Sequence, residues 1–168
     1  IDNTNNIYLT GNYSGTVDFD PGVGVDNHSS NGLEDVFLSK YDINGNYQWA
    51  KSFGGSGMDV AYDVEVDNSN NPWICGYYNS TVDFDPSILT ANSTSVGFAD
   101  IFISKFNEIG TFLWNYSVGG TNNDVASSLI LSPNNKMTVC GNYSGTVDFD
   151  PTASVFNLTN LTGEAFVA

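Results

Sequence analysis

Arginine is absent from the 168-residue sequence, and lysine occurs only four times, at Lys40, Lys51, Lys105 and Lys136. Asp and Glu together number 19, so the formal net charge is −15. Binding to nucleic acid or to an anionic membrane surface depends on clustered Lys and Arg that neutralise phosphates. The composition therefore argues against both partners, while a charge of this size favours solubility and attracts cations.

Further shortages narrow the possible functions. The sole histidine, His28, lies in the polar segment 26–30 without a recognisable partner in the sequence. A Ser-His-Asp mechanism therefore has no support, and we expect His28 to be a solvated loop residue. The two cysteines have no nearby histidine for a papain-like pair. No apolar run approaches the roughly 18 residues of a transmembrane helix. We therefore expect neither an enzyme nor a membrane-inserted segment.

Repetition is what the sequence has in abundance. The eleven residues Gly11–Pro21 (GNYSGTVDFDP) return unchanged at Gly141–Pro151, and a near copy, Gly76–Pro86, lies between them. Both steps are 65 residues long. A fixed period filled with strand-like segments predicts one supersecondary unit stacked on copies of itself. This pattern indicates a protein built around a repeated surface and not around a single catalytic pocket.

Each unit is expected to form four β-strands. In the second copy the candidates are residues 59–66, 72–78, 100–106 and 111–118, and a long insert at 79–99 carries the TVDFDP motif. The segments are rich in Val, Ile, Tyr, Phe and Trp and are separated by Asn, Asp and Gly, which is typical of all-β proteins. No 3.6-residue apolar period extends over more than two turns, so we expect almost no helix. Four antiparallel strands per unit predict a β-propeller blade.

The array divides into a partial blade at 1–53, a blade at 54–118 and a partial blade at 119–168. This is an incomplete array of about two and a half blades, whereas closed propellers have about 4–8. Because the sequence starts with Ile1 and enters and leaves inside a unit, we expect a segment of a longer protein. The alternative is a subunit whose blades are completed by strands of a neighbouring copy, which would build a filament or a ring.

Two sets of matched positions have a structural interpretation. The pairs Gly54-Gly55 and Gly119-Gly120 suit a crossing between blades, where the backbone needs positive φ or close approach. Cys75 and Cys140 occupy the same repeat position. Equivalent positions of stacked units rarely come within the Cα separation of about 7 Å that a disulfide needs. We therefore expect the cysteines to be small buried residues without a disulfide or metal role.

The segment 35–78, DVFLSKYDINGNYQWAKSFGGSGMDVAYDVEVDNSNNPWICGYY, resembles the SBBP β-propeller repeat, whose units run D-x-F-x-x-K, an N/D-G turn, W and G-G. The GTVDFDP insert is similar to those of long secreted repeat proteins of the Bacteroidota. The resemblance covers essentially the whole chain and departs at 71–73 and, by one residue of register, at 164–166. It implies a secreted propeller, but this family has no settled activity to transfer, and fold alone does not imply function.

The TVDFDP motif supplies the candidate metal ligands Asp18, Asp20, Asp83, Asp85, Asp148 and Asp150. In an extended segment residues i and i+2 share a face, so each Asp pair points one way while Val and Phe point inward. Such a pair is a candidate Ca²⁺ site together with carbonyls and water. The alternative is that the Asp side chains cap the turns made by Pro21, Pro86 or Pro151. Because the pair recurs in the same context, we do not expect the carboxylates to be catalytic.

Aromatic and asparagine side chains give the remaining candidates. Tyr13, Tyr78 and Tyr143 match across the copies, and exposed rings there would stack on sugar faces; the alternative is packing at the rim. Asn-x-Ser/Thr sequons mark glycosylation candidates, although many arise by chance in a chain so rich in Asn, Ser and Thr. The sequon residues are Asn12, Asn27, Asn79, Asn92, Asn115, Asn142, Asn157 and Asn160.

These observations predict an extracellular or cell-surface all-β module that serves in scaffolding or adhesion and presents a rigid acidic surface, with Ca²⁺ as a candidate stabiliser. The expected partners are the remaining blades of a longer chain or neighbouring subunits, together with glycans. The alternatives are a carbohydrate-binding propeller and a non-catalytic segment of a larger secreted enzyme that acts on polysaccharides.

Overall fold

The computed structural model describes residues 1–150 and 154–168, with the side chains of all of these except residues 161 and 162. Within these ranges every regular element is a β-strand, so the expected all-β fold without helix is confirmed. The strands are β1 (Ile7–Tyr13), β2 (Thr16–Asp18), β3 (Asn27–Ser29), β4 (Asp35–Tyr41), β5 (Tyr47–Phe53), β6 (Val60–Val66), β7 (Pro72–Asp83), β8 (Asn92–Phe106), β9 (Phe112–Val118), β10 (Val125–Leu131), β11 (Met137–Asp148) and β12 (Asn157–Val167).

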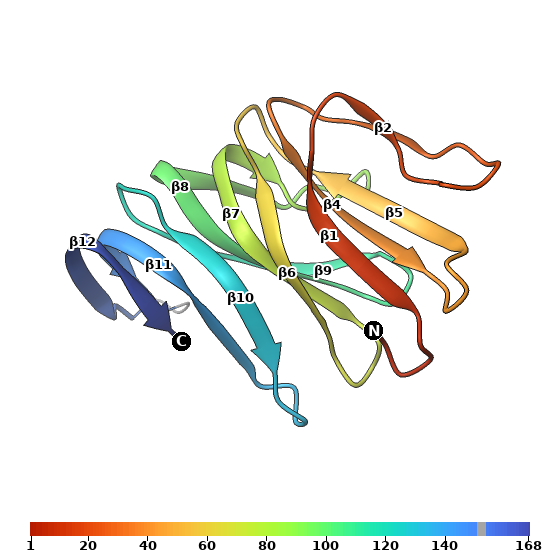
Figure 1. The fold of residues 1–168 in the computed structure, drawn as a ribbon. Helices are drawn as coiled ribbons and strands as arrows, with labels where there is room; N and C mark the ends of the chain where they lie inside the picture. The colour runs from red at the N-terminus through yellow and green to blue at the C-terminus, as the bar shows by residue number, and fades with distance from the viewer. Residues whose placement is uncertain (151–153) are drawn as a thin grey trace.

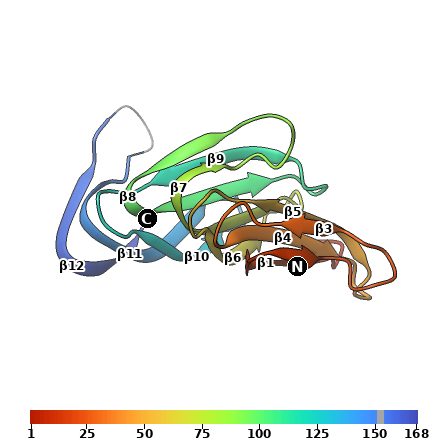
Figure 2. The same ribbon diagram turned by 90° about the horizontal axis from the view of Figure 1, so that it is seen from above.

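The strands form three main antiparallel sheets that follow one another in sequence order. The second sheet has four strands in the order β6-β7-β8-β9, the meander of a propeller blade. The first sheet contains β1-β4-β5 and the third contains β10-β11-β12. Figure 1 shows the three sheets side by side, from red to blue, with β6 between β1 and β10. Figure 2 shows the same row from above, and the described sheets do not close into a barrel.

The insert between the second and third strands of a unit is itself β-structure. In the first sheet it forms the hairpin β2–β3, with Thr16 opposite Ser29. In the second sheet β7 and β8 continue past an irregularity into the same hairpin, with Thr81 opposite Thr94. The irregularity is marked by a positive φ at one position of each copy: Gly15 (70°), Ser80 (69°) and Gly145 (83°).

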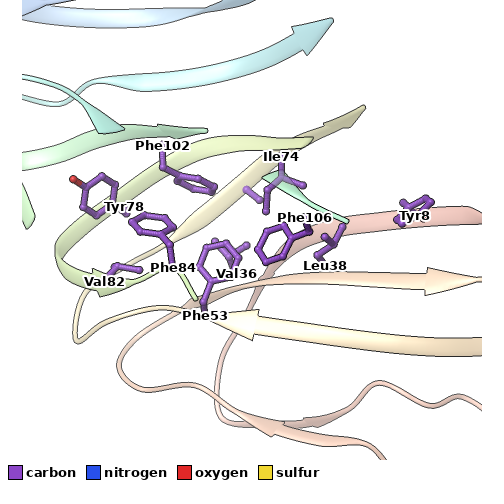
Figure 3. Close-up of a cluster of buried hydrophobic side chains, with 11 residues drawn as sticks. Tyr8, Val36, Leu38, Phe53, Ile74, Tyr78, Val82, Phe84, Phe102 and Phe106 are labelled. Carbon is purple, nitrogen blue, oxygen red and sulfur yellow. The ribbon is translucent and has the colours of Figure 1, made fainter. Parts of the chain in front are cut away.

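The hydrophobic core lies between successive sheets. Figure 3 shows the cluster between the first and second sheets, where Val36, Leu38 and Phe53 of the first sheet meet Phe84 and Phe102 of the second. An equivalent cluster of buried residues joins the second sheet to the third. Because the second sheet packs against a neighbour on each face, the joints between sheets hold most of the core, as expected for repeat architectures.

Asparagine side chains link the turns at one end of the sheets. The Nδ2 group of Asn3 donates to the carbonyl of Asn68, and the backbone N–H of Asn3 donates to Oδ1 of Asn70, both at 3.0 Å. One repeat later, Asn68 donates in the same way to the carbonyl of Pro133 (2.6 Å) and to Oδ1 of Asn135 (3.3 Å). The turns between first and second strands therefore form a ladder across the three sheets.

Two of the four lysines form ion pairs with an aspartate of their own sheet. Nζ of Lys105 lies 2.9 Å from Oδ2 of Asp67, and Nζ of Lys40 lies 3.6 Å from Oδ2 of Asp2. Each ammonium group also lies over an aromatic ring, 4.5 and 5.1 Å from the ring centroid. Both lysines thus neutralise the aspartate that begins a turn of their own sheet, and the pairing repeats with the 65-residue period.

Candidate functional site

The apolar residues of the TVDFDP motif point inward, as predicted. Val82 and Phe84 are fully buried, and the ring of Phe84 packs against Phe53 of the preceding sheet with 5.4 Å between centroids. Val147 of the third copy is likewise fully buried. In the second copy the insert hairpin therefore packs across the joint between two sheets, whereas Val17 and Phe19 of the first copy pack within their own copy.

The first aspartate of each motif caps the turn of the insert. Oδ1 of Asp83 accepts hydrogen bonds from the N–H groups two and eight residues later, at 3.1 and 2.8 Å. Asp18 makes the same two bonds at 3.1 and 2.9 Å, and Asp148 makes them at 3.0 and 2.8 Å. The structural interpretation is thus confirmed for these three residues, whereas Pro151 lies outside the described residues.

The second aspartate extends this pattern in the first two copies. Oδ1 of Asp20 accepts from the N–H of Gly22 at 2.8 Å, and Oδ1 of Asp85 accepts from the N–H of Ser87 at 2.9 Å. In residues 1–150 and 154–168 no group of three or more His, Cys, Asp or Glu side chains is placed to hold a metal ion. Calcium binding by the motif, including its third-copy residue Asp150, stays a prediction.

The three matched tyrosines are not exposed, so the expectation of a sugar-stacking platform is corrected. Tyr13, Tyr78 and Tyr143 are only 7%, 1% and 7% exposed. Each ring meets the phenylalanine of its own TVDFDP motif edge-on, with centroids 5.2–5.4 Å apart. The insert hairpin folds back over the strand from which it emerges and covers the tyrosine, which leaves no ring face for a ligand.

The sequon asparagines differ in exposure. Asn12, Asn27, Asn92, Asn142 and Asn157 are exposed. Asn79 and Asn115 are half-buried, and the Asn115 amide is engaged by Ser93, Ser104 and Ser117. Asn160 is buried, so a glycan on it would disrupt the sheet.

A cleft of about 490 Å³ opens at the end of the second sheet where β6 and β10 begin. Its lining combines apolar Leu33, Met58 and Val125 with polar Asn79 and Asn123. Leu33 is 62% exposed, and its equivalent one repeat later, Phe98, is 61% exposed. Exposed large apolar side chains around a concave site mark candidate binding surfaces. This cleft is therefore the candidate functional site.

Two tyrosines extend this surface. Tyr77 lines the cleft, and Tyr62 on the neighbouring strand is largely exposed, with 6.0 Å between the two ring centroids. Burial raises the pKa of Tyr77 above its ordinary value. The Tyr77 hydroxyl therefore stays protonated at neutral pH and can donate a hydrogen bond to a partner. The repeat pattern does not reveal this pair, because Tyr77 is replaced by Asn12 and Asn142 in the other copies.

His28 has partners, so the expectation of a solvated loop residue is wrong. Nδ1 of His28 lies 2.8 Å from Oγ of Ser52, and Nε2 lies 3.3 Å from Oδ1 of Asp26. The hydroxyl of Tyr47 donates to the other oxygen of Asp26. The chain of side chains ties the β2–β3 hairpin to strand β5. A hydroxyl, an imidazole and a carboxylate are thus in contact, and we interpret the cluster as a tether.

This tether is confined to the first copy. Asp26 and His28 correspond to Ala91 and Ser93 in the second copy. The sequence carries a signal for this tether, because Asp26 and His28 are positions at which the copies differ. The contact itself depends on Ser52, 24 residues further along the chain, and only the folded hairpin brings it to His28.

The cysteines behave as small apolar residues. Cys75 is fully buried and Cys140 is half-buried, and both are free thiols. Burial raises the pKa of Cys75 to about 12, so its thiol is protonated and unreactive at neutral pH.

The described residues contain no helix with the length and apolar character needed to cross a membrane.

Stacked antiparallel sheets with one repeated joint define the chain as a β-propeller-type repeat module. It is 28% identical over 169 aligned residues to an uncharacterized WD repeat-containing protein, L264, of Acanthamoeba polyphaga mimivirus, which covers 86% of this chain and 12% of that protein. It is 26% identical over 124 residues to the regulatory protein FlaEY of Caulobacter vibrioides, which covers 71% of this chain and 13% of that protein. The chain thus spans about an eighth of each relative, and no family model matches it.

Proposed function

We propose that the chain is a scaffolding module of the SBBP-repeat type that acts outside the cell or at its surface and binds a protein partner through the cleft at Leu33, Met58 and Tyr77. The observation that carries the proposal is the exposed apolar rim of this cleft on a chain of net charge −15. A partner that buries this rim and complements the charge is an extended segment that carries both apolar and basic residues.

The resemblance to a WD repeat-containing protein supports a binding role in place of catalysis. The joints between sheets also support it, because each joint repeats one packing arrangement and gives the cleft a rigid base. Adhesion follows if several such modules present the cleft repeatedly along one chain, since linked sites raise the effective concentration of each other's ligands.

Peptide binding tests the proposal directly. Two ten-residue peptides share the same Leu and Phe positions and differ only in carrying Lys or Glu between them. We expect the lysine peptide to bind in fluorescence anisotropy and to weaken as salt rises, while the glutamate peptide does not bind. Leu33→Ser with Met58→Ser is expected to weaken binding at least tenfold. Ile43→Ser, in the turn between β4 and β5 at the other end of the sheet, is the matched control.

Failure of both peptides to bind, or an equal effect of the Ile43 control, contradicts the proposed cleft. Binding of oligosaccharides that is lost in the Leu33/Met58 variant favours the carbohydrate-binding alternative. The location is tested separately by proteolysis of intact source cells. Digestion of the full-length protein while a cytosolic marker survives supports the surface location, and protection contradicts it.

A further inference from the structure

Two joints between successive sheets contain the same buried pair of carboxylates. At the first joint Asp35 begins β4 and Asp59 precedes β6, and at the second joint Asp100 and Asp124 take the equivalent places. All four side chains are between 0% and 3% exposed. Buried charges are normally paired with an opposite charge or bound to a metal, so the partners of these groups are informative.

The second member of each pair is satisfied by backbone groups alone. The N–H of Gly55 donates to Oδ2 of Asp59 at 2.7 Å, and the N–H of Asn79 donates to Oδ1 at 3.0 Å. Asp124 accepts the same two bonds from Gly120 and Ser144, at 2.7 and 2.9 Å. These bonds fix each carboxylate in place without neutralising its charge.

The first member of each pair has one carboxylate oxygen that accepts no hydrogen bond from the described residues. Oδ2 of Asp35 accepts from the N–H of Asn31 at 3.0 Å, and Oδ2 of Asp100 accepts from the N–H of Val96 at 3.0 Å. Their Oδ1 atoms are buried and accept no hydrogen bond from the described residues. The same oxygen is therefore left over at both joints, 65 residues apart, which argues for a common ligand.

Glycine makes room for each of these carboxylates. A Cβ atom on Gly54 would lie 2.4 Å from Cγ of Asp35, and one on Gly119 would lie 2.2 Å from Cγ of Asp100. Any other residue at these positions would displace the carboxylate. The first glycine of each pair therefore serves the acidic site, in addition to the crossing between sheets that the sequence indicated.

In the described part of the chain, none of these four carboxylates forms an ion pair with a basic side chain. The sequence has no arginine, and Lys40 and Lys105 are paired with Asp2 and Asp67. Each joint thus buries two carboxyl groups without a basic partner.

We propose that each joint binds one Ca²⁺ ion, with Asp35 and Asp59 as ligands at the first joint and Asp100 and Asp124 at the second. Ca²⁺ is a hard cation that takes carboxylate oxygens together with carbonyls and water in irregular geometry, whereas Mg²⁺ demands a near-ideal octahedron. The ion would neutralise both carboxylates and coordinate the Oδ1 atom that accepts no hydrogen bond. This places the metal between the sheets and not on the TVDFDP turns.

Binding stoichiometry distinguishes the two locations. Isothermal titration of the metal-free chain with CaCl₂ is expected to give two Ca²⁺ per chain, one for Asp35→Asn, and none for Asp35→Asn combined with Asp100→Asn. Asp18→Asn, in the insert, is the matched control and is expected to retain two. No binding by the wild-type chain, or losses that follow the insert variants instead, would overturn the proposal.

Thermal unfolding gives a second readout with opposite signs. In EDTA, Asp35→Asn removes an uncompensated buried charge and is expected to raise the Tm. In millimolar CaCl₂ the same variant loses a ligand and is expected to have a lower Tm than the wild type. A higher Tm for the variant under both conditions means that the pair holds a proton and no metal, which contradicts the proposal.

Discussion

Phe53 and Phe84, from neighbouring sheets, pack with 5.4 Å between ring centroids and an interplanar angle of 51°. Phe53 ends the outer strand of the first sheet, and Phe84 follows the insert strand of the second. Phe84 also contacts Tyr78 and Phe102 within its own sheet. The insert is therefore part of the joint between sheets and contributes to the cohesion of the array.

Truncation of this ring is expected to destabilise the array. Because Phe84 is fully buried, Phe84→Ala should lower the free energy of unfolding by about 3–5 kcal/mol through lost burial and the cavity left behind. Urea unfolding followed by tryptophan fluorescence measures this change. Phe98→Ala, at a largely exposed ring, is the control and should change stability by less than about 0.5 kcal/mol. Equal effects of the two variants would contradict the assigned role of the insert.

A backbone irregularity offers a stabilising substitution. Ser80 has a φ of 69°, where the other two copies have Gly15 and Gly145. This conformation costs a residue with a Cβ about 1–2 kcal/mol, so Ser80→Gly is expected to raise the free energy of unfolding by about 0.5–1 kcal/mol, given the greater freedom of glycine in the unfolded chain. Gly15→Ser is the reciprocal test, because a Cβ there meets no atom within 4 Å. A loss of stability in Ser80→Gly would refute the strain.

Stability should depend on pH in an unusual direction. The pKa values of Asp59 and Asp100 are raised to about 6 by burial and by their facing carboxylates. A raised pKa means that the folded chain binds protons more tightly than the unfolded chain. The resulting stabilisation is fully present below the unfolded pKa of about 4 and is lost as the pH rises through about 6. In EDTA, the Tm should therefore fall between pH 5 and pH 7.

Asp2 and Asp67, which begin the turns, determine how the stability falls at acidic pH. Burial by itself would raise the pKa of Asp2 and of Asp67, but hydrogen bonds from neighbouring groups lower both to about 2. Their stabilisation is present above about pH 4 and is lost as the pH falls through about 2. The maximum Tm is thus expected near pH 4–5. A Tm that rises steadily from pH 4 to pH 7 in EDTA would contradict the assignment of the buried pairs.

The His28 tether predicts a local effect. His28→Ser, which installs the residue of the second copy, removes the contacts of the imidazole with Ser52 and Asp26. We expect a loss of about 1–2 kcal/mol and faster amide exchange in β2 and β3 than in β1. Ser93→Ala at the equivalent position of the second copy is the control. Unchanged exchange in the hairpin would mean that the apolar contacts of Phe19 hold it without the tether.

The repeat and its strands could be predicted from the sequence because both depend on local patterns of residues. Alternation placed Val82 and Phe84 on the buried face, and the copied motif gave the period. Contacts between distant segments could not be predicted in this way. Tyr78 seemed exposed because nothing local shows that the insert folds back over it. Asp59 and Asp100 begin predicted strands, and nothing in the sequence marks them as buried, since acidic side chains are rarely buried; only the stacked sheets reveal their burial.

The asparagine ladder makes the two ends of the array differ in the hydrogen bonds that they can donate to a further sheet. Asn3 and Asn68 each donate two hydrogen bonds to the next turn, but the third turn has Pro133 at this position, which has neither a backbone N–H nor a side-chain amide. A further sheet stacked on the third would therefore lack both bonds at this end. Under a pulling force, the array should part there first, while the two joints within the chain still hold.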